Sequence, residues 1–306
     1  MKNFDTVLMI MEYTIILFYK YTHISNPKKL RQEQFDLCEK LGLKGRVIVA
    51  EEGINATLEG TTENINTYLA EYLSDPRFSD THIKRSVGTG EAFPKLSVKA
   101  RKEIVSLHLE EDFSPTEVTG VHLKPEELKQ WFTEKEVGKD FYIVDMRNDY
   151  EYNVGRFVGS VMPKLENFRD VPRVLNELEP LQDKPVVTVC TGGVRCEKAS
   201  GFLVKNGFKN VYQLDGGIVT YMEKFPAQEF QGKLYVFDKR ITMDFDPSDK
   251  HVVVGKCGKC ATPSERYVNC KRPECNKHFL CCEQCSEEDG KSFCTEDCKE
   301  MYSSIL

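Results

Sequence analysis

The sequence predicts an α/β protein in three successive parts: an α+β sandwich, an α/β domain with a parallel sheet, and a cysteine-rich segment. Strand-like and helix-like runs alternate in two blocks, 13–87 and 121–224, with a different order of elements in each. Nine of the twelve cysteines lie between Cys257 and Cys298. A chain of 306 residues normally forms two or three domains, and we place them at residues 12–108, 121–226 and 230–306.

The first block predicts the order βαββαβ. Its β-branched and aromatic runs predict strands at Tyr13–Tyr21, 46–50, 54–58 and 82–87. Pro27 opens one helix, and Thr61 or Thr62 caps a second helix that runs to Leu73. This order is typical of a ferredoxin-like, or acylphosphatase-like, sandwich.

A basic stretch follows the fourth strand. Between residues 84 and 102 the only acid is Glu91, against six cations: Lys84, Arg85, Lys95, Lys99, Arg101 and Lys102. Clustered lysine and arginine side chains suit the phosphates of a nucleic acid. A solvated face or a connector explains the same composition equally well. Residues 110–120 are acidic and turn-rich, and we expect a linker there.

The second block alternates strands and helices, which predicts a parallel sheet covered on both faces. We expect strands at 141–144, near 159–162, at 186–189 and at 211–214, and helices at 123–132, 149–153, 167–178, 197–206 and 217–224. Ligands bind at the carboxyl ends of such strands. Asp145, Cys190 and Asp215 each stand at one of these ends, which favours a functional site over an inert buried thiol.

The loop after the third of these strands is the candidate catalytic site. Cys190 precedes a short loop and then a helix, so loop amides and the helix N-terminus favour a thiolate at the mouth of the loop. The active-site loop comprises Thr191, Gly192, Gly193, Val194 and Arg195. The loop of a cysteine phosphatase is longer, because it wraps a phosphate, whereas this loop encloses about one sulfur atom.

Three further residues support this site in the prediction: Asp145, Arg147 and Cys196. Cys196 is a second thiol that could resolve a sulfenate or persulfide on Cys190 as a disulfide. The alternative is a packing cysteine that points away from Cys190. We favour that alternative, because Cys196 falls on the first turn of the helix.

The tail predicts a metal-binding segment. Its four cysteine pairs are Cys257 with Cys260, Cys270 with Cys275, Cys282 with Cys285, and Cys294 with Cys298. Eight thiolates suffice for two tetrahedral zinc sites, and so short a segment with few apolar residues needs such support. An interleaved arrangement joins the first pair to the third and the second to the fourth. Cys281 is then surplus, and His278 is an alternative ligand.

Other classes fit less well. Disulfides are disfavoured because no signal peptide precedes the cysteines, and iron–sulfur spacings match less closely. The net charge of −6 gives no global attraction to nucleic acid or membrane, and it does not exclude a local basic patch. No apolar run approaches the roughly 20 residues of a membrane span, so we expect a cytoplasmic protein. The sequence has no flavin, nicotinamide or P-loop fingerprint.

Residues 121–225 resemble a rhodanese domain. The resemblance lies in Val144–Arg147 with Glu151 and Gly155, in Gly159-Ser160, in the loop Cys190–Arg195, and in Leu214–Gly217. It implies that Cys190 is the nucleophile and that the amides of the loop surround its sulfur. Arg156 and Tyr221 depart from the histidine and tryptophan common in rhodaneses, and neither touches the loop.

Motifs along the whole chain narrow the resemblance. They are Glu52–Asn55, Phe93–Leu96, Arg147–Glu151, Asn167–Arg169, Cys190–Lys198 and Tyr235–Arg240. Together they resemble the rhodanese-domain tRNA uridine hydroxylases. That family implies tRNA as partner, molecular oxygen as co-substrate, and conversion of the wobble uridine to 5-hydroxyuridine by means of Cys190. The electron donor, the tRNA set and the oligomeric state cannot be predicted from the sequence.

Two alternatives remain open. A plain sulfurtransferase would carry a persulfide on Cys190, but it needs neither the N-terminal domain nor the tail. A non-enzymatic scaffold would bind RNA or protein through the tail and the basic stretch, and the intact Cys190 loop argues against it.

Overall fold

The structure is a computed structural model that describes residues 12–109, 113–246, 248, 251–286 and 292–304. The chain divides into two compact units, Met1–Val105 and Ser106–Leu306. Within the described ranges, no helix has the length and apolarity that a membrane span requires.

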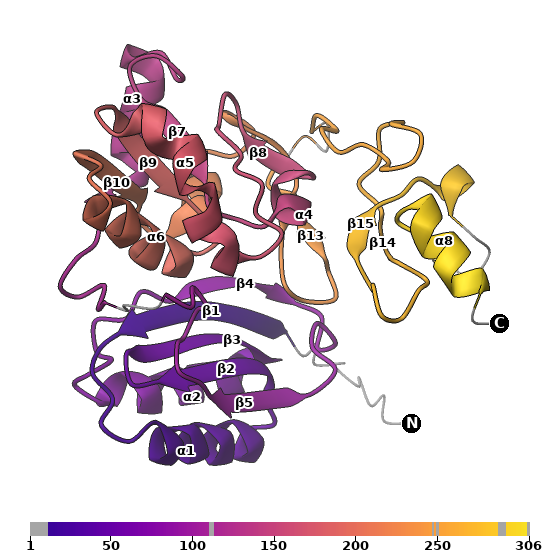
Figure 1. The fold of residues 1–306 in the computed structure, drawn as a ribbon. Coiled ribbons are helices and arrows are strands. Elements are labelled where there is room, and N and C mark those ends of the chain that lie inside the picture. The colour runs from indigo at the N-terminus through magenta and orange to yellow at the C-terminus, as the bar shows by residue number, and fades with distance from the viewer. Residues whose placement is uncertain (1–11, 110–112, 247, 249–250, 287–291, 305–306) are drawn as a thin grey trace, which may run out of the picture. The chain divides into compact units, whose positions relative to one another are not determined.

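Unit 1 is built on one five-stranded sheet (Figure 1). In the order β4-β1-β3-β2-β5, its strands are Lys84–Gly88, Tyr13–Tyr21, Gly53–Thr61, Lys44–Ala50 and Leu96–Ala100. Helices α1 (Pro27–Lys40) and α2 (Thr62–Ser74) pack against it. This topology confirms the predicted ferredoxin-like sandwich. Strand β5 was not expected, because the lysines of the basic stretch masked its alternation; it pairs parallel to β2.

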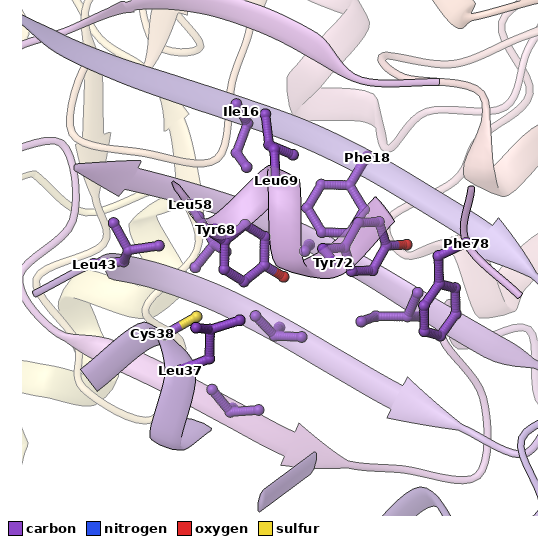
Figure 2. Packing of buried hydrophobic residues seen from close by; sticks show 14 of the residues in the cluster. Ile16, Phe18, Leu37, Cys38, Leu43, Leu58, Tyr68, Leu69, Tyr72 and Phe78 are labelled. Carbon is purple, nitrogen blue, oxygen red and sulfur yellow. The ribbon is translucent and has the colours of Figure 1, made fainter. Parts of the chain in front are cut away.

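The core of unit 1 lies between the sheet and the two helices (Figure 2). Phe18 of β1 packs 4.6 Å from Tyr72 of α2, centroid to centroid, and Tyr72 stacks on Phe78 at 4.8 Å. Each such side chain contributes about 1.5–3 kcal/mol when fully buried. Cys38 of α1 lies in the same core, where burial raises its pKa to about 12. That cysteine is therefore an unreactive thiol near neutral pH.

Unit 2 contains a second sheet, in which all four strands are parallel. In the order β6-β10-β9-β7, the strands are Val121–Leu123, Asn210–Leu214, Pro185–Val189 and Tyr142–Asp145. The helices of this part are α3 (Pro125–Glu134), α4 (Asp149–Tyr152), α5 (Leu175–Leu178), α6 (Val194–Lys205) and α7 (Gly217–Lys224). The parallel α/β architecture is as predicted.

Several predicted elements of unit 2 need correction. Leu123 ends β6 and does not open a helix. The prediction of a strand near Gly159–Met162 is wrong. Gly159 lies in a turn with φ +72°, and only an isolated bridge joins Val161 to Val144. The strand of this region is instead β8 (Gly155–Phe157), which pairs with β11 (Phe230–Gly232).

The helix predicted over 167–178 is divided. A 3₁₀ helix, η1 (Phe168–Val174), precedes α5, and a second 3₁₀ helix, η2 (Glu179–Leu181), follows it. Pro172 lies inside η1 and has no N–H to donate to an α-helical ladder. Helix α6 begins at Val194, three residues earlier than predicted, so that the loop after Cys190 is very short.

The tail packs against the α/β part of unit 2. Its elements are β12 (Leu234–Tyr235), β13 (Thr242–Met243), β14 (Tyr267–Asn269), β15 (His278–Leu280), η3 (Glu283–Cys285) and α8 (Glu296–Ser303). The hydroxyl of Tyr267 donates to the carbonyl of Tyr150 in α4, and Leu280 and Tyr235 share a cluster with Val154. The tail therefore supports α4, which carries a residue of the site.

Candidate active site

The Cys190 loop is held between two helix N-termini. Cys190 directly follows β9, and the N–H of Gly193 donates to its Sγ at 3.2 Å. The amides of Ile218 and Val219 in α7 donate to the carbonyls of Cys190 and Thr191, at 2.9 and 3.0 Å. The start of α7 thus holds the backbone of the Cys190 loop through two hydrogen bonds.

Gly217 is the residue that allows α7 to approach so closely. It has φ +73°, and a Cβ at this position would lie 2.7 Å from the carbonyl oxygens of Cys190 and Thr191 and from the nitrogen of Gly193. Only glycine avoids both the backbone strain and this overlap. Gly217 therefore determines the shape of the loop although it lies far along the chain.

A buried ion pair places a cation beside the sulfur. Arg195, in the first turn of α6, donates from Nη1 and Nη2 to the two carboxylate oxygens of Glu151 at 2.5 and 2.8 Å. Glu151 also accepts from the hydroxyl of Thr191 at 3.3 Å and from the N–H of Asn148 at 3.0 Å. A bidentate pair of this kind fixes the guanidinium rigidly.

Glu151 is a site residue to which the sequence assigned no role. It is fully buried in α4, and the charge that it pairs lies 44 residues downstream. Its signals in the sequence were its place in the motif Arg147–Glu151 and its spacing from Asn148, with which it forms a capping box at the start of α4.

Asp145 and Arg147 lie together but do not form part of the loop. The Arg147 guanidinium donates to both oxygens of Asp145, at 2.9 and 2.6 Å, and to the carbonyl of Gly155 at 2.7 Å. Both side chains are fully buried. The pair links the end of β7 to β8, which makes it a positioning element for α4. Asp215, by contrast, is exposed at the end of β10.

The Cys190 thiol is strongly acidic. Burial acts to raise its pKa, but the hydrogen bond from the Cys196 thiol, the charge of Arg195 and the N–H groups of Cys196 and Gly193 outweigh that effect and lower the pKa to about 6. At neutral pH Cys190 is therefore mostly a thiolate. Its exposure differs from the prediction: Cys190 is fully buried, and the start of α7 packs against the backbone of its loop.

Cys196 faces the site, so the favoured prediction that it points away is wrong. It is fully buried, and its thiol and the Cys190 sulfur change each other's pKa. Burial and the neighbouring Cys190 sulfur raise the pKa of Cys196 well above its ordinary value, so Cys196 is the protonated partner of the pair. The inward orientation follows from the start of α6 at Val194, which places Cys196 on the inner side of the first turn.

An exposed aromatic side chain from the tail lies next to this site. Phe237 is 43% exposed, and the Arg195 guanidinium lies over its ring, 5.8 Å from the centroid. The ring also packs edge-on against Tyr235 at 5.3 Å. Phe237 is thus a flat apolar surface beside the ion pair; the sequence places it in the motif Tyr235–Arg240 but did not assign it to the site.

The basic stretch does not form one surface. Lys84 and Arg85 lie on β4 at one edge of the unit 1 sheet, and Lys99 lies on β5 at the opposite edge. Lys84 is buried, with its ammonium 5.5 Å from the centroid of the Tyr19 ring. The exposed cations of the β5 edge are Lys95, Lys99, Arg101 and Lys102, joined by Arg46 of the neighbouring strand β2.

The eight tail cysteines form two groups. The first comprises Cys257, Cys260, Cys282 and Cys285, and the second Cys270, Cys275, Cys294 and Cys298; within each group all four sulfurs lie within 4.8 Å of one another. This is the interleaved arrangement. Sulfur pairs in both groups approach to 3.6 Å, near the roughly 3.8 Å that tetrahedral Zn–S bonds of 2.3 Å produce. Each group can therefore hold a metal ion.

Two neighbouring side chains lie outside these groups. The Nδ1 of His278 is 2.7 Å from the amide oxygen of Asn269, and its ring stacks on Tyr267 at 4.6 Å. Cys281 is buried in the cluster that contains Cys257. Neither belongs to a set of four ligands.

Known families match all three parts of the chain. Residues 13–104 match the UPF0176 acylphosphatase like domain, 124–224 the Rhodanese-like domain, and 231–299 the Rhodanase C-terminal model. The tRNA uridine(34) hydroxylase of Bacillus licheniformis is 45% identical over 291 residues, which cover 94% of this chain and 88% of that protein. The protein of the same name from Onion yellows phytoplasma is 44% identical over 291 residues, covering 94% and 92%.

Among solved structures, a rhodanese-like domain protein from Staphylococcus aureus is 28% identical. The match covers 33% of this chain and 90% of that one, with a TM-score of 0.28.

Proposed function

The chain belongs to the tRNA uridine(34) hydroxylase family, and from this premise we propose that it converts the wobble uridine of tRNA to 5-hydroxyuridine with molecular oxygen. The observation that carries the proposal is the likeness to these enzymes over 94% of the chain. A rhodanese loop by itself serves sulfur transfer equally well, but the likeness also spans unit 1 and the tail.

Cys190 is the proposed nucleophile. C6 of a uracil ring is electron-poor, and addition of a thiolate at C6 makes C5 electron-rich enough to attack an oxidant. A pKa of about 6 keeps the Cys190 sulfur ionised at neutral pH. Arg195, held by Glu151, and the amide of Gly193 stabilise this negative charge until the base arrives.

Phe237 is the proposed stacking surface for the base. The wobble base lies in the anticodon loop, so it is unpaired and costs little to splay out. Stacking of a base on an aromatic ring contributes about 1–3 kcal/mol. Because Cys190 has no exposed surface, the base reaches the sulfur only after the groups that cover it move.

The β5 edge of unit 1 is the proposed contact for the tRNA backbone. Arg46 and Lys99 are exposed on adjacent strands in register, with Ser97 opposite Arg46 and Lys99 opposite Ile48, so both side chains project from the same face of the sheet. Lys95 and Arg101 flank them at the two ends of β5. Side chains of this kind neutralise phosphates and make binding dependent on salt.

Zinc is the proposed occupant of the two cysteine groups. Sets of four thiolates suit tetrahedral zinc, which would link the strands and short helices of the tail. The metal would act structurally: the tail supports α4 through Tyr267 and Tyr150, and α4 carries Glu151.

The decisive experiment is nucleoside analysis of tRNA from cells that lack this protein. We expect 5-hydroxyuridine and its derivatives at the wobble position to disappear, and to return with the native protein but not with Cys190→Ser. Unchanged oxygenated uridines in the deletion, with no second pathway present, would refute the proposal. Loss of 2-thiouridine instead would favour the sulfurtransferase alternative.

A further inference from the structure

Hydroxylation by molecular oxygen has a fixed electron requirement. One oxygen atom becomes the hydroxyl group at C5 and the other becomes water, which consumes two electrons and two protons beyond those of the substrate. Two thiols that close to a disulfide release two electrons and two protons. Two neighbouring thiols, one of which adds to the reacting base, would therefore supply the two electrons and two protons that the reaction consumes.

Cys190 and Cys196 are such a pair. Both side chains are fully buried, and each thiol changes the pKa of the other. Both cysteines also bond to the same residue of the loop, because the N–H of Gly193 donates to the Cys190 sulfur at 3.2 Å and the N–H of Cys196 donates to the Gly193 carbonyl at 2.9 Å. Gly193, the N-cap of α6, therefore holds both residues at the start of this helix.

The remaining ten cysteines have other places in the structure. Eight form the two metal groups, Cys38 lies in the core of unit 1, and Cys281 lies in the cluster with Cys257. Burial shields the Cys190–Cys196 pair from oxidants in solution, so its oxidation to a disulfide would accompany turnover.

We propose that Cys196 is a second catalytic residue and that the Cys190–Cys196 dithiol supplies the two electrons of hydroxylation, closing to a disulfide once per turnover. This inference rests on the proposed function and names its electron donor. A thiol reductant, either a dithiol protein or a small thiol, would reopen the disulfide by exchange. The immediate reductant is then part of this chain.

The steps balance as follows. The Cys190 thiolate adds to C6, and the resulting C5 carbanion takes up O₂ and a proton to form a C5 hydroperoxide. The Cys196 thiol attacks the outer oxygen, which leaves a C5 hydroxyl group and a sulfenic acid on Cys196. Loss of the C5 proton expels Cys190 and restores the C5–C6 double bond. The Cys190 thiol then displaces water from the sulfenic acid of Cys196 and forms the disulfide.

A single-turnover experiment tests this assignment. The full-length protein is reduced, freed of reductant under nitrogen, and mixed with a tRNA transcript that has uridine at the wobble position; oxygen is then admitted. We expect about one 5-hydroxyuridine per protein and, in step with it, a Cys190–Cys196 disulfide detected by alkylation and peptide mass spectrometry. Cys196→Ala should form less than about a tenth as much product, whereas Cys38→Ala, which removes another buried thiol, should match the wild type.

Two outcomes would overturn the inference alone. One is product from the wild type with both thiols still open to alkylation after unfolding; the other is an undiminished single turnover in Cys196→Ala. The first readout uses only the wild type, so it stands even if the variant folds poorly. If the wild type forms no 5-hydroxyuridine even with excess dithiothreitol and oxygen, the proposed function itself fails, and the inference fails with it.

Discussion

Replacement of Arg195 by methionine separates the electrostatic role of this residue from its structural role. Methionine keeps an unbranched apolar stem but has no charge, so Arg195→Met removes the cation beside Cys190 and leaves the fully buried Glu151 carboxylate without its partner. Breaking a buried pair in this way costs about 3–5 kcal/mol of folding free energy. The double variant Glu151→Gln/Arg195→Met has no uncompensated carboxylate, and it should regain most of that loss.

The acidity of Cys190 should not recover in the double variant. With a pKa of about 6, the wild-type sulfur is roughly nine-tenths ionised at pH 7. Without the Arg195 charge the pKa rises, and a return toward 9 would leave on the order of one-hundredth ionised.

Both quantities can be measured on the same proteins. Urea unfolding reports the free energy, and ultraviolet thiolate absorbance, taken as a difference from Cys190→Ser at each pH, reports ionisation. We expect the double variant to be nearly as stable as the wild type yet to titrate well above pH 6. A titration midpoint still near 6 in the stable double variant would refute the role assigned to Arg195.

Three further predictions follow from the same structure. The rate with limiting tRNA should rise as the pH increases through about 6 and level off above it, because protonation of Cys190 below its pKa removes the nucleophile; a flat profile from pH 5 to 8 would contradict this. Gly217→Ala should abolish turnover by displacing the loop. Gly138 also has a positive φ, but a Cβ there would meet nothing within 4 Å, so Gly138→Ala should lose only about 1 kcal/mol of stability and keep its activity. Equal activities of the two variants would be evidence against the packing argument. Lys99→Ala should weaken tRNA binding and reduce the slope of log affinity against log salt by about 1. Arg85→Ala, at the opposite edge of the sheet, should change neither the affinity nor the slope. Equal effects of the two variants would exclude the β5 edge as the tRNA contact.

The sequence determined the features that depend on neighbours along the chain. The strand that ends at Cys190, the short glycine loop and the helix after it are adjacent in sequence, so their residue types suffice to predict a strand–loop–helix thiol site. The spacing of the eight tail cysteines likewise predicts two sets of four, because short CxxC-type spacings already bring two sulfurs to one ion.

Only the tertiary structure decided which distant groups act on that thiol. Glu151 reaches Arg195 across 44 residues, and Gly217 allows α7 to approach the backbone of the loop closely. The inward direction of Cys196 depends on where α6 begins, and local propensity defines a helix start only to within a few residues. Charge pairing and close approach of backbones act through space, and therefore the acidity and the burial of Cys190 were settled by packing.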